Sequence, residues 1–200
     1  MYESGVRRNP MSLLRTISTN WIMSTISSYK DIIIRPNALY VFDIDDTLIH
    51  FPEFTRSWWK ETTQKYKMVC EETADDNAHA EWIGAVEVRP GFACDKDGFK
   101  EVYTNILNVG GKVILLTARP EHMKTLTMRH LREGLWDFDA KHVHFDKEKG
   151  QRLRKILKDH YKDINQVIFV DDYDKNIESV RDAFSGSNIS LDTYLYVHRS

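Results

Sequence analysis

The pentad DIDDT at residues 43–47 brings three carboxylates together directly after an apolar run at 38–42. A continuous apolar run of this length is typical of a buried parallel strand, so the carboxylates stand where a strand leaves the core. Crowded carboxylates repel one another and are costly to remove from water. A hard cation that prefers oxygen ligands, such as Mg2+, relieves both costs. The pentad therefore indicates a cation site, although Asp and Thr are also common in turns and helix caps.

Three later apolar runs end in polar residues in the same way. The run 112–116 leads into Thr117, Ala118 and Arg119, the run 143–145 leads into Lys147 and Lys149, and the run 167–170 leads into Asp171 and Asp172, with Asn176 beyond them. Ligands of open α/β sheets bind outside the carboxyl ends of the strands. We therefore expect these side chains to meet the pentad at one edge of a sheet.

The elements that must position these residues alternate between strand-like and helix-like segments from Asn37 onward. Strands are predicted at 38–43, 112–117, 142–145, 166–171 and 191–197, and amphipathic helices at 99–107, 123–131, 153–161 and 177–184. Such alternation is typical of an α/β fold. The prediction is a Rossmann-like, mostly parallel, five-stranded sheet flanked by helices.

Residues 50–88 interrupt this alternation with a helical stretch that is rich in aromatic and charged residues. The stretch leaves the sheet just after the pentad and returns near Arg89, so we predict a small helical cap that covers the site. Most of its aromatic side chains are expected to form its own core, with one or two facing the cleft. The predicted organisation is an N-terminal arm at 1–37 and a catalytic domain at 38–200, with the cap insertion at 50–88.

Composition limits the classes of partner and the compartment. Two hundred residues fit one domain, and 28 basic against 30 acidic residues favour neither a nucleic-acid nor a membrane partner. No apolar run approaches the roughly 20 residues that span a bilayer. Cys70 and Cys94 do not make a disulfide framework, which favours a reducing, cytoplasmic compartment. The segment from Gly5 to Lys30 lacks acidic residues, a feature of organellar targeting, but an arm packed on the domain is the preferred interpretation.

The motifs, taken in order, resemble those of the haloacid-dehalogenase-like (HAD) superfamily of phosphohydrolases. They are DIDDT at 43–47, LLTAR at 115–119, a lysine at 147 or 149, and FVDDYDKN at 169–176. The resemblance covers about residues 38–180, and the set of four motifs is more specific than any one of them. The segment KGQRL at 149–153, which leads into the DD motif, is similar to the phosphatase branches of the superfamily.

The resemblance implies a Mg2+-dependent phosphomonoester hydrolase that acts through an aspartyl-phosphate on Asp43. Asp45 would be the general acid and base. Thr117 and Lys149 would hold the transferring phosphoryl group. Mg2+ would bind the Asp43 carboxylate, the main-chain carbonyl of Asp45 and the Asp172 carboxylate.

Further residues of the motifs are assigned substrate-binding or supporting roles. Substrate contacts are expected from Thr117, Ala118, Arg119 and Trp58, and supporting contacts from Thr47, Asp171, Asn176 and Lys147. For Arg119, an ion pair at the start of the following helix is an equal alternative to a phosphate contact. Because the spacing before the helix varies, Lys147 stays an alternative to Lys149 as the lysine of the site. Stacking by Trp58 or Trp59 would favour a nucleobase.

The substrate and the oligomeric state are left open by the sequence. A small phosphorylated metabolite or nucleotide is the preferred substrate. A nucleic-acid end, guided by the basic helix at 152–162, is the first alternative and predicts strongly salt-dependent binding. The second alternative, of another class, is a non-catalytic phosphate-binding or regulatory module with the same fold.

Overall fold

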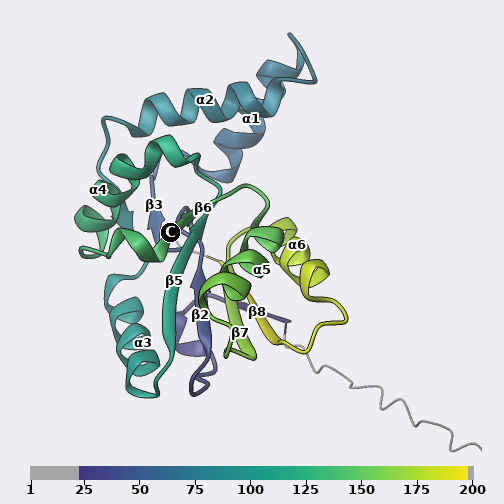
Figure 1. The fold of residues 1–200 in the computed structure, drawn as a ribbon. Helices are drawn as coiled ribbons and strands as arrows, with labels where there is room; N and C mark the ends of the chain where they lie inside the picture. The colour runs from purple at the N-terminus through teal and green to yellow at the C-terminus, as the bar shows by residue number, and fades with distance from the viewer. Residues whose placement is uncertain (1–22, 198–200) are drawn as a thin grey trace, which may run out of the picture.

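A computed structural model describes residues 23–197, which form a central parallel sheet covered by helices (Figure 1). The sheet has the strand order β1-β8-β7-β2-β5-β6, and every neighbouring pair is parallel. The strands are β1 (Met23–Ile26), β2 (Leu39–Phe42), β5 (Lys112–Thr117), β6 (Val143–Phe145), β7 (Gln166–Asp171) and β8 (Ser190–Tyr196). The predicted α/β class and the mostly parallel sheet are confirmed.

The predicted number of five strands is wrong, because β1 adds a sixth strand beside β8. Of the four residues of β1 only Ile26 is buried, so this edge strand lacks the apolar run that marks the others. Residues 1–22 lie outside the described residues, so the targeting character of the acid-poor segment stays a prediction. No helix in the described part of the chain combines the length and the apolar character needed to cross a membrane.

Side chains of β2 alternate between two hydrophobic layers. Tyr40 and Phe42 belong to one layer, and Leu39 and Val41 belong to the other. Helices α3 (Lys96–Asn108) and α4 (Lys124–Gly134) cover the first face, and α5 (Lys149–His160) and α6 (Asp174–Phe184) cover the second (Figure 1). Because both faces are covered, all four residues of β2 are buried, which explains the unbroken apolar run in the sequence.

The predicted helical cap is present between two short strands that follow the pentad. It consists of α1 (Arg56–Lys67) and α2 (Ala74–Val86), and β3 (Ile49–His50) pairs antiparallel with β4 (Phe92–Ala93) at its base. The Thr55 side chain caps α1 by accepting a hydrogen bond from the Trp58 N–H at 3.4 Å. Three short 3-10 helices, η1 (Tyr29–Asp31), η2 (Glu121–Met123) and η3 (Ala140–His142), complete the elements of the described chain. The proposed boundaries of the arm and the cap insertion stay predictions.

The sheet order decides which motifs become neighbours. Strand β2 lies between β7 and β5, with Phe42 beside Val170 on one side and Leu115 on the other. The Asp43 N–H continues the ladder by donating to the Val170 carbonyl at 2.9 Å. The residues that follow these strands therefore lie at one edge of the sheet, where ligands of this architecture bind.

Candidate active site

The pentad forms a tight loop that is fastened at several points. The N–H groups of Leu48 and Ile49 both donate to the Ile44 carbonyl at 2.8 Å. Asp46 has a φ of +53°, a left-handed conformation that Asp tolerates better than most residues. The buried Tyr29 hydroxyl donates a hydrogen bond to the Thr47 carbonyl, so a segment before the resemblance supports the loop. The loop holds Asp43 and Asp45 on the wall of a cavity.

Lys149 connects two motifs through a buried ion-pair cluster. Its Nζ lies 2.5 Å from Asp43 Oδ1 and 2.7 Å from Asp171 Oδ2, and its side chain is 1% exposed. Burial acts to lower the pKa of Lys149, but Asp171 and Asp43 together outweigh it and raise the pKa above its ordinary value. Lys149 is therefore a charged ammonium group beside the Asp43 carboxyl.

The carboxylates at the sheet edge outnumber the positive charge that Lys149 supplies. Burial raises the pKa of Asp43 well above its ordinary value, and Asp171, Asp172 and Asp45 add to this effect, while Lys149 opposes it. Carboxylate oxygens of Asp43, Asp171 and Asp172 lie within 4.8 Å of one another. This donor set of carboxylate oxygens fits a hard divalent cation such as Mg2+.

The two carboxylates of the DD motif have different surroundings. Asp171 is buried, and its oxygens accept hydrogen bonds from Lys149, from the Tyr173 N–H at 2.9 Å and from Asn176 Nδ2 at 3.0 and 3.2 Å. Asp172 is half-buried and lines the cavity. Asp43 and Asp172 both line the cavity and could hold a cation together. Asp171 binds Lys149, and Asn176 binds Asp171.

Arg119 makes a two-pronged ion pair with Asp45. Its Nη2 lies 2.6 Å from Asp45 Oδ1, and its Nε lies 2.9 Å from Asp45 Oδ2. The guanidinium is buried, although Asp45 itself is partly exposed. The sequence left Arg119 between a substrate contact and an ion pair. In the structure it makes an ion pair with Asp45 and also lines the cavity, so the substrate contact stays a prediction. Both oxygens of Asp45 accept from this one guanidinium, which fixes the plane of the carboxylate.

The remaining predicted site residues divide between the cavity wall and its surroundings. Ala118 lines the cavity, but Thr117 is buried behind it, where its hydroxyl accepts from the Arg119 N–H at 3.1 Å. Thr47 Oγ1 lies 3.5 Å from Asp43 Oδ2. Trp58 is not among the residues that line the cavity, whereas the neighbouring Trp59 is.

Lys147 occupies a different place from Lys149. It pairs with Asp76 of α2 at 3.3 Å, and both side chains are largely exposed. In the structure Lys149, not Lys147, contacts the nucleophile candidate Asp43. Lys147 instead connects the loop before α5 with the cap.

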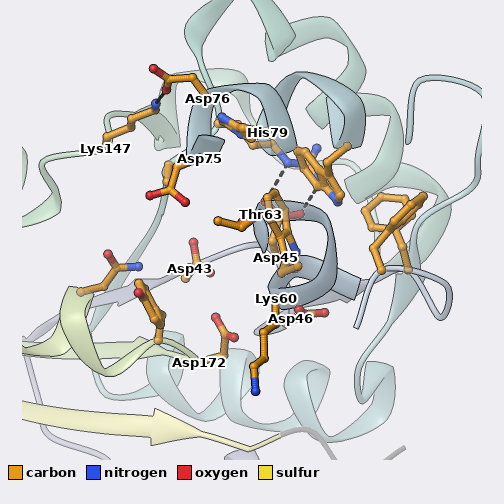
Figure 2. Close-up of a pocket in the computed structure, with 18 of the residues that line it drawn as sticks. Asp43, Asp45, Asp46, Lys60, Thr63, Asp75, Asp76, His79, Lys147 and Asp172 are labelled. Carbon is orange, nitrogen blue, oxygen red and sulfur yellow. Dashed lines mark hydrogen bonds and ion pairs between the residues drawn. The ribbon is translucent and has the colours of Figure 1, made fainter. Parts of the chain in front are cut away.

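The cavity lies between the sheet edge and the cap and has a volume of about 800 Å³. Figure 2 shows Asp43, Asp45 and Asp172 on the core side, with Asp75, Asp76 and His79 of α2 on the cap side. From α1, the cavity is lined by Trp59, Lys60, Thr63, Gln64 and Lys67. Sequence reasoning did not identify this wall, although four of its polar residues recur at the spacing of one helical face.

A family model described as a protein of unknown function, DUF2608, matches residues 16–147 and 143–200. Among curated proteins, none matches the sequence of the chain.

Several solved structures are similar to the chain. The class C acid phosphatase from Bacillus anthracis is 16% identical, with a TM-score of 0.43, over 84% of this chain and 70% of that one. The HAD domain of the effector protein Lem4 from Legionella pneumophila is 10% identical, with a TM-score of 0.46, over 82% and 87%. A haloacid dehalogenase-like family hydrolase from Xanthomonas campestris is 16% identical, with a TM-score of 0.48, over 78% and 82%.

The four motifs of the sequence meet at the edge of a single parallel sheet. Strand β2 delivers Asp43, the start of α5 delivers Lys149, and β7 delivers Asp171, and these three side chains are in direct contact. A mostly parallel α/β sheet with all four motifs at one edge is the arrangement that the resemblance to the haloacid-dehalogenase-like superfamily implies.

Proposed function

The chain belongs to the DUF2608 family of proteins of unknown function, and we propose that it is a Mg2+-dependent phosphomonoester hydrolase with Asp43 as its nucleophile. One observation carries this proposal. Asp43 lies on the cavity wall and is paired with the buried Lys149, within reach of the carboxylates of Asp171 and Asp172. A carboxylate, an ammonium group and a cation site in one cleft are the parts that phosphoryl transfer to a carboxylate needs.

The cation would be held by the Asp43 and Asp172 carboxylates together with the main-chain carbonyl of Asp45. When bound, Mg2+ supplies positive charge that allows the anionic phosphoryl group and the anionic nucleophile to approach. Lys149 supplies a second positive charge at the same place and orients the Asp43 carboxylate through Oδ1.

In the first half of the reaction, Asp43 attacks phosphorus in line with the leaving oxygen. Oδ1 is engaged by Lys149, whereas Oδ2 has the longer 3.5 Å contact with Thr47, so Oδ2 is the attacking oxygen. The bond from Oδ2 to phosphorus forms while the bond from phosphorus to the leaving oxygen breaks. Asp45 gives the leaving oxygen a proton, which makes the released product an alcohol.

In the second half, water hydrolyses the phosphoryl group on Asp43. Asp45, now a carboxylate, takes a proton from the attacking water. The bond from the water oxygen to phosphorus forms, the bond to Asp43 Oδ2 breaks, and inorganic phosphate leaves. The pair of hydrogen bonds from Arg119 holds Asp45 in the orientation of this base.

The substrate we propose is a small phosphorylated metabolite or nucleotide. A volume of about 800 Å³ is within the usual range for small-molecule sites, and the wall combines the Trp59 indole with Lys60, Thr63 and Gln64. The nucleic-acid alternative is less favoured, because the basic residues Arg154, Lys155 and Lys158 of α5 line a separate depression and not this cavity.

The experiment is hydrolysis of para-nitrophenyl phosphate by the purified chain, with Mg2+ and with a chelator. The proposal predicts turnover only with the metal and its loss in Asp43→Asn. Asp163→Asn, an exposed change of the same type in the loop between α5 and β7 and outside the four motifs, serves as the control. Absence of metal-dependent turnover, even at acidic pH, would favour the non-catalytic module.

Metal binding is measured separately from activity. Mg2+ binds the folded state only, so it should raise the melting temperature of the wild type. The shift should be lost in Asp172→Asn and kept in Asp163→Asn. An equal shift in Asp172→Asn would remove Asp172 from the cation site.

A further inference from the structure

Arg119 is held by more than its pairing with Asp45. Its Nη1 lies 3.1 Å from Thr127 Oγ1 and 3.1 Å from His130 Nδ1, both on α4. Its guanidinium also lies over the ring of Trp82, 5.3 Å from the centroid. The side chain is almost entirely buried, so these contacts determine the position of the guanidinium that binds Asp45.

The contacts of His130 define its tautomer. Arg119 Nη1 is only a donor, so Nδ1 of the fully buried His130 ring must accept and carries no proton. The proton is then on Nε2, which donates to the Val86 carbonyl at 3.2 Å. Burial, Arg119 and Arg129 lower the pKa of His130 to about 4, which keeps the ring neutral at ordinary pH.

The Val86 carbonyl belongs to the last residue of α2, which is a cap helix. The neighbouring Arg129 Nη2 donates to the Glu87 carbonyl at 2.6 Å. It also lies 3.3 Å from His130 Nε2, and this contact is not a hydrogen bond because both nitrogens are donors when Nε2 carries the proton. Helix α4 thus binds the carbonyl groups at the end of α2. An unbroken series of polar contacts runs from the end of α2 through His130 and Arg119 to Asp45.

We propose that His130 is a positioning residue that joins the end of the cap helix α2 to Arg119 and thereby sets the orientation of Asp45. The inference rests on the proposed function, since it assigns Asp45 its acid and base role. Without His130, one buried Nη1–H of Arg119 loses its acceptor. The guanidinium then lacks one of the contacts with α4 that set its position. Small displacements of a catalytic group lower the rate strongly. A displaced Asp45 should therefore slow the step in which the leaving oxygen is protonated.

The test compares two phosphate esters that differ in their need for a general acid. Phenyl phosphate has a poor leaving group that requires the proton from Asp45, whereas para-nitrophenolate leaves without much assistance. We measure kcat/KM, which covers the steps up to cleavage of the ester bond, for the wild type, His130→Leu and His130→Gln. His130→Leu should lose about tenfold or more on phenyl phosphate and less than about threefold on para-nitrophenyl phosphate. His130→Gln should restore most of the loss, because an amide oxygen accepts and an amide N–H donates.

The matched control is His144→Leu, which removes a half-buried neutral histidine from β6, outside these contacts. It should not discriminate between the two esters. Equal losses on both esters in a folded His130→Leu, or no loss on either, would overturn the inference while leaving the phosphatase proposal intact. A wild type that hydrolyses neither ester would instead contradict the phosphatase proposal.

The tautomer is read in the wild-type protein, independently of activity and of whether the variants fold. Two-bond proton–nitrogen NMR correlations of the His130 ring should show a neutral ring with its proton on Nε2. A proton on Nδ1 is incompatible with acceptance from Arg119 and would overturn the inference.

Discussion

Lys147 and Lys149 are two residues apart in the chain, yet their surroundings are opposite. Lys149 is 1% exposed and contacts two carboxylates of the sheet edge, at 2.5 and 2.7 Å. Lys147 is 61% exposed and contacts one carboxylate of the cap, at 3.3 Å. A buried pair interacts strongly because water does not screen it, whereas an exposed pair contributes little. The contacts of Lys149 therefore hold the core side of the cavity strongly, whereas the contact of Lys147 with the cap is weak.

The largest expected effect is that of Lys149→Met. It leaves Asp43 and Asp171 buried without their counter-charge, so it should lower the free energy of unfolding by about 3–5 kcal/mol. It should also lower kcat by about 10²–10³-fold, because a positive charge beside the phosphoryl group is lost. Urea unfolding and steady-state hydrolysis of para-nitrophenyl phosphate measure the two effects. Near-wild-type stability would show that the buried pair is not the one described.

An intermediate effect concerns the pH dependence of stability. The pKa of His130 is about 4 in the folded state, against 6.5 for an unperturbed histidine. Between these values the unfolded chain binds a proton that the folded chain does not, so the free energy of unfolding falls as the pH drops from about 6.5 to about 4. The contribution is about 3 kcal/mol and is fully present above pH 6.5. His144, with a pKa also lowered to about 4, acts in the same direction.

Denaturant unfolding at several pH values measures this effect. His130→Gln should flatten the fall between pH 6.5 and 4, and His144→Gln should flatten it separately. An unchanged slope in His130→Gln would mean that the His130 ring is protonated in the folded state.

The smallest expected effect is that of Lys147→Met. An exposed pair of this kind contributes little and is screened by salt. We expect no measurable change in the melting temperature and a change in KM within about threefold, with kcat unchanged. A loss in kcat approaching that of Lys149→Met would show that Lys147 contacts the reacting group and that the two lysines do not differ in role.

The sequence predicted the parts of this site that depend on the local pattern. The apolar run before Asp43 predicted β2, and the polar residues after each run predicted the shared sheet edge. The choice between Lys147 and Lys149 depends on how the chain enters α5, which the spacing of residues does not determine. Strand β1 was missed because an exposed edge strand lacks an apolar run.

The local pattern of residue types does not predict contacts between segments that are far apart in the sequence. Arg119 lies two residues after Thr117, which suggested a substrate contact or an ion pair, but the pattern did not identify Asp45 as the partner of its buried guanidinium. The role of Tyr29 depends on the packing of its ring against Tyr196, with the centroids 4.8 Å apart. Such partners are chosen by tertiary packing and leave no periodic signal in the chain.

The most direct measurement is the site of phosphorylation during turnover. The wild type is mixed rapidly with substrate and Mg2+ and quenched in acid, and its peptides are examined by mass spectrometry. We expect one acid-stable phosphoryl group on the peptide that contains Asp43 and none in Asp43→Asn. A phosphoryl group on another residue, or hydrolysis that proceeds normally in Asp43→Asn, would contradict it.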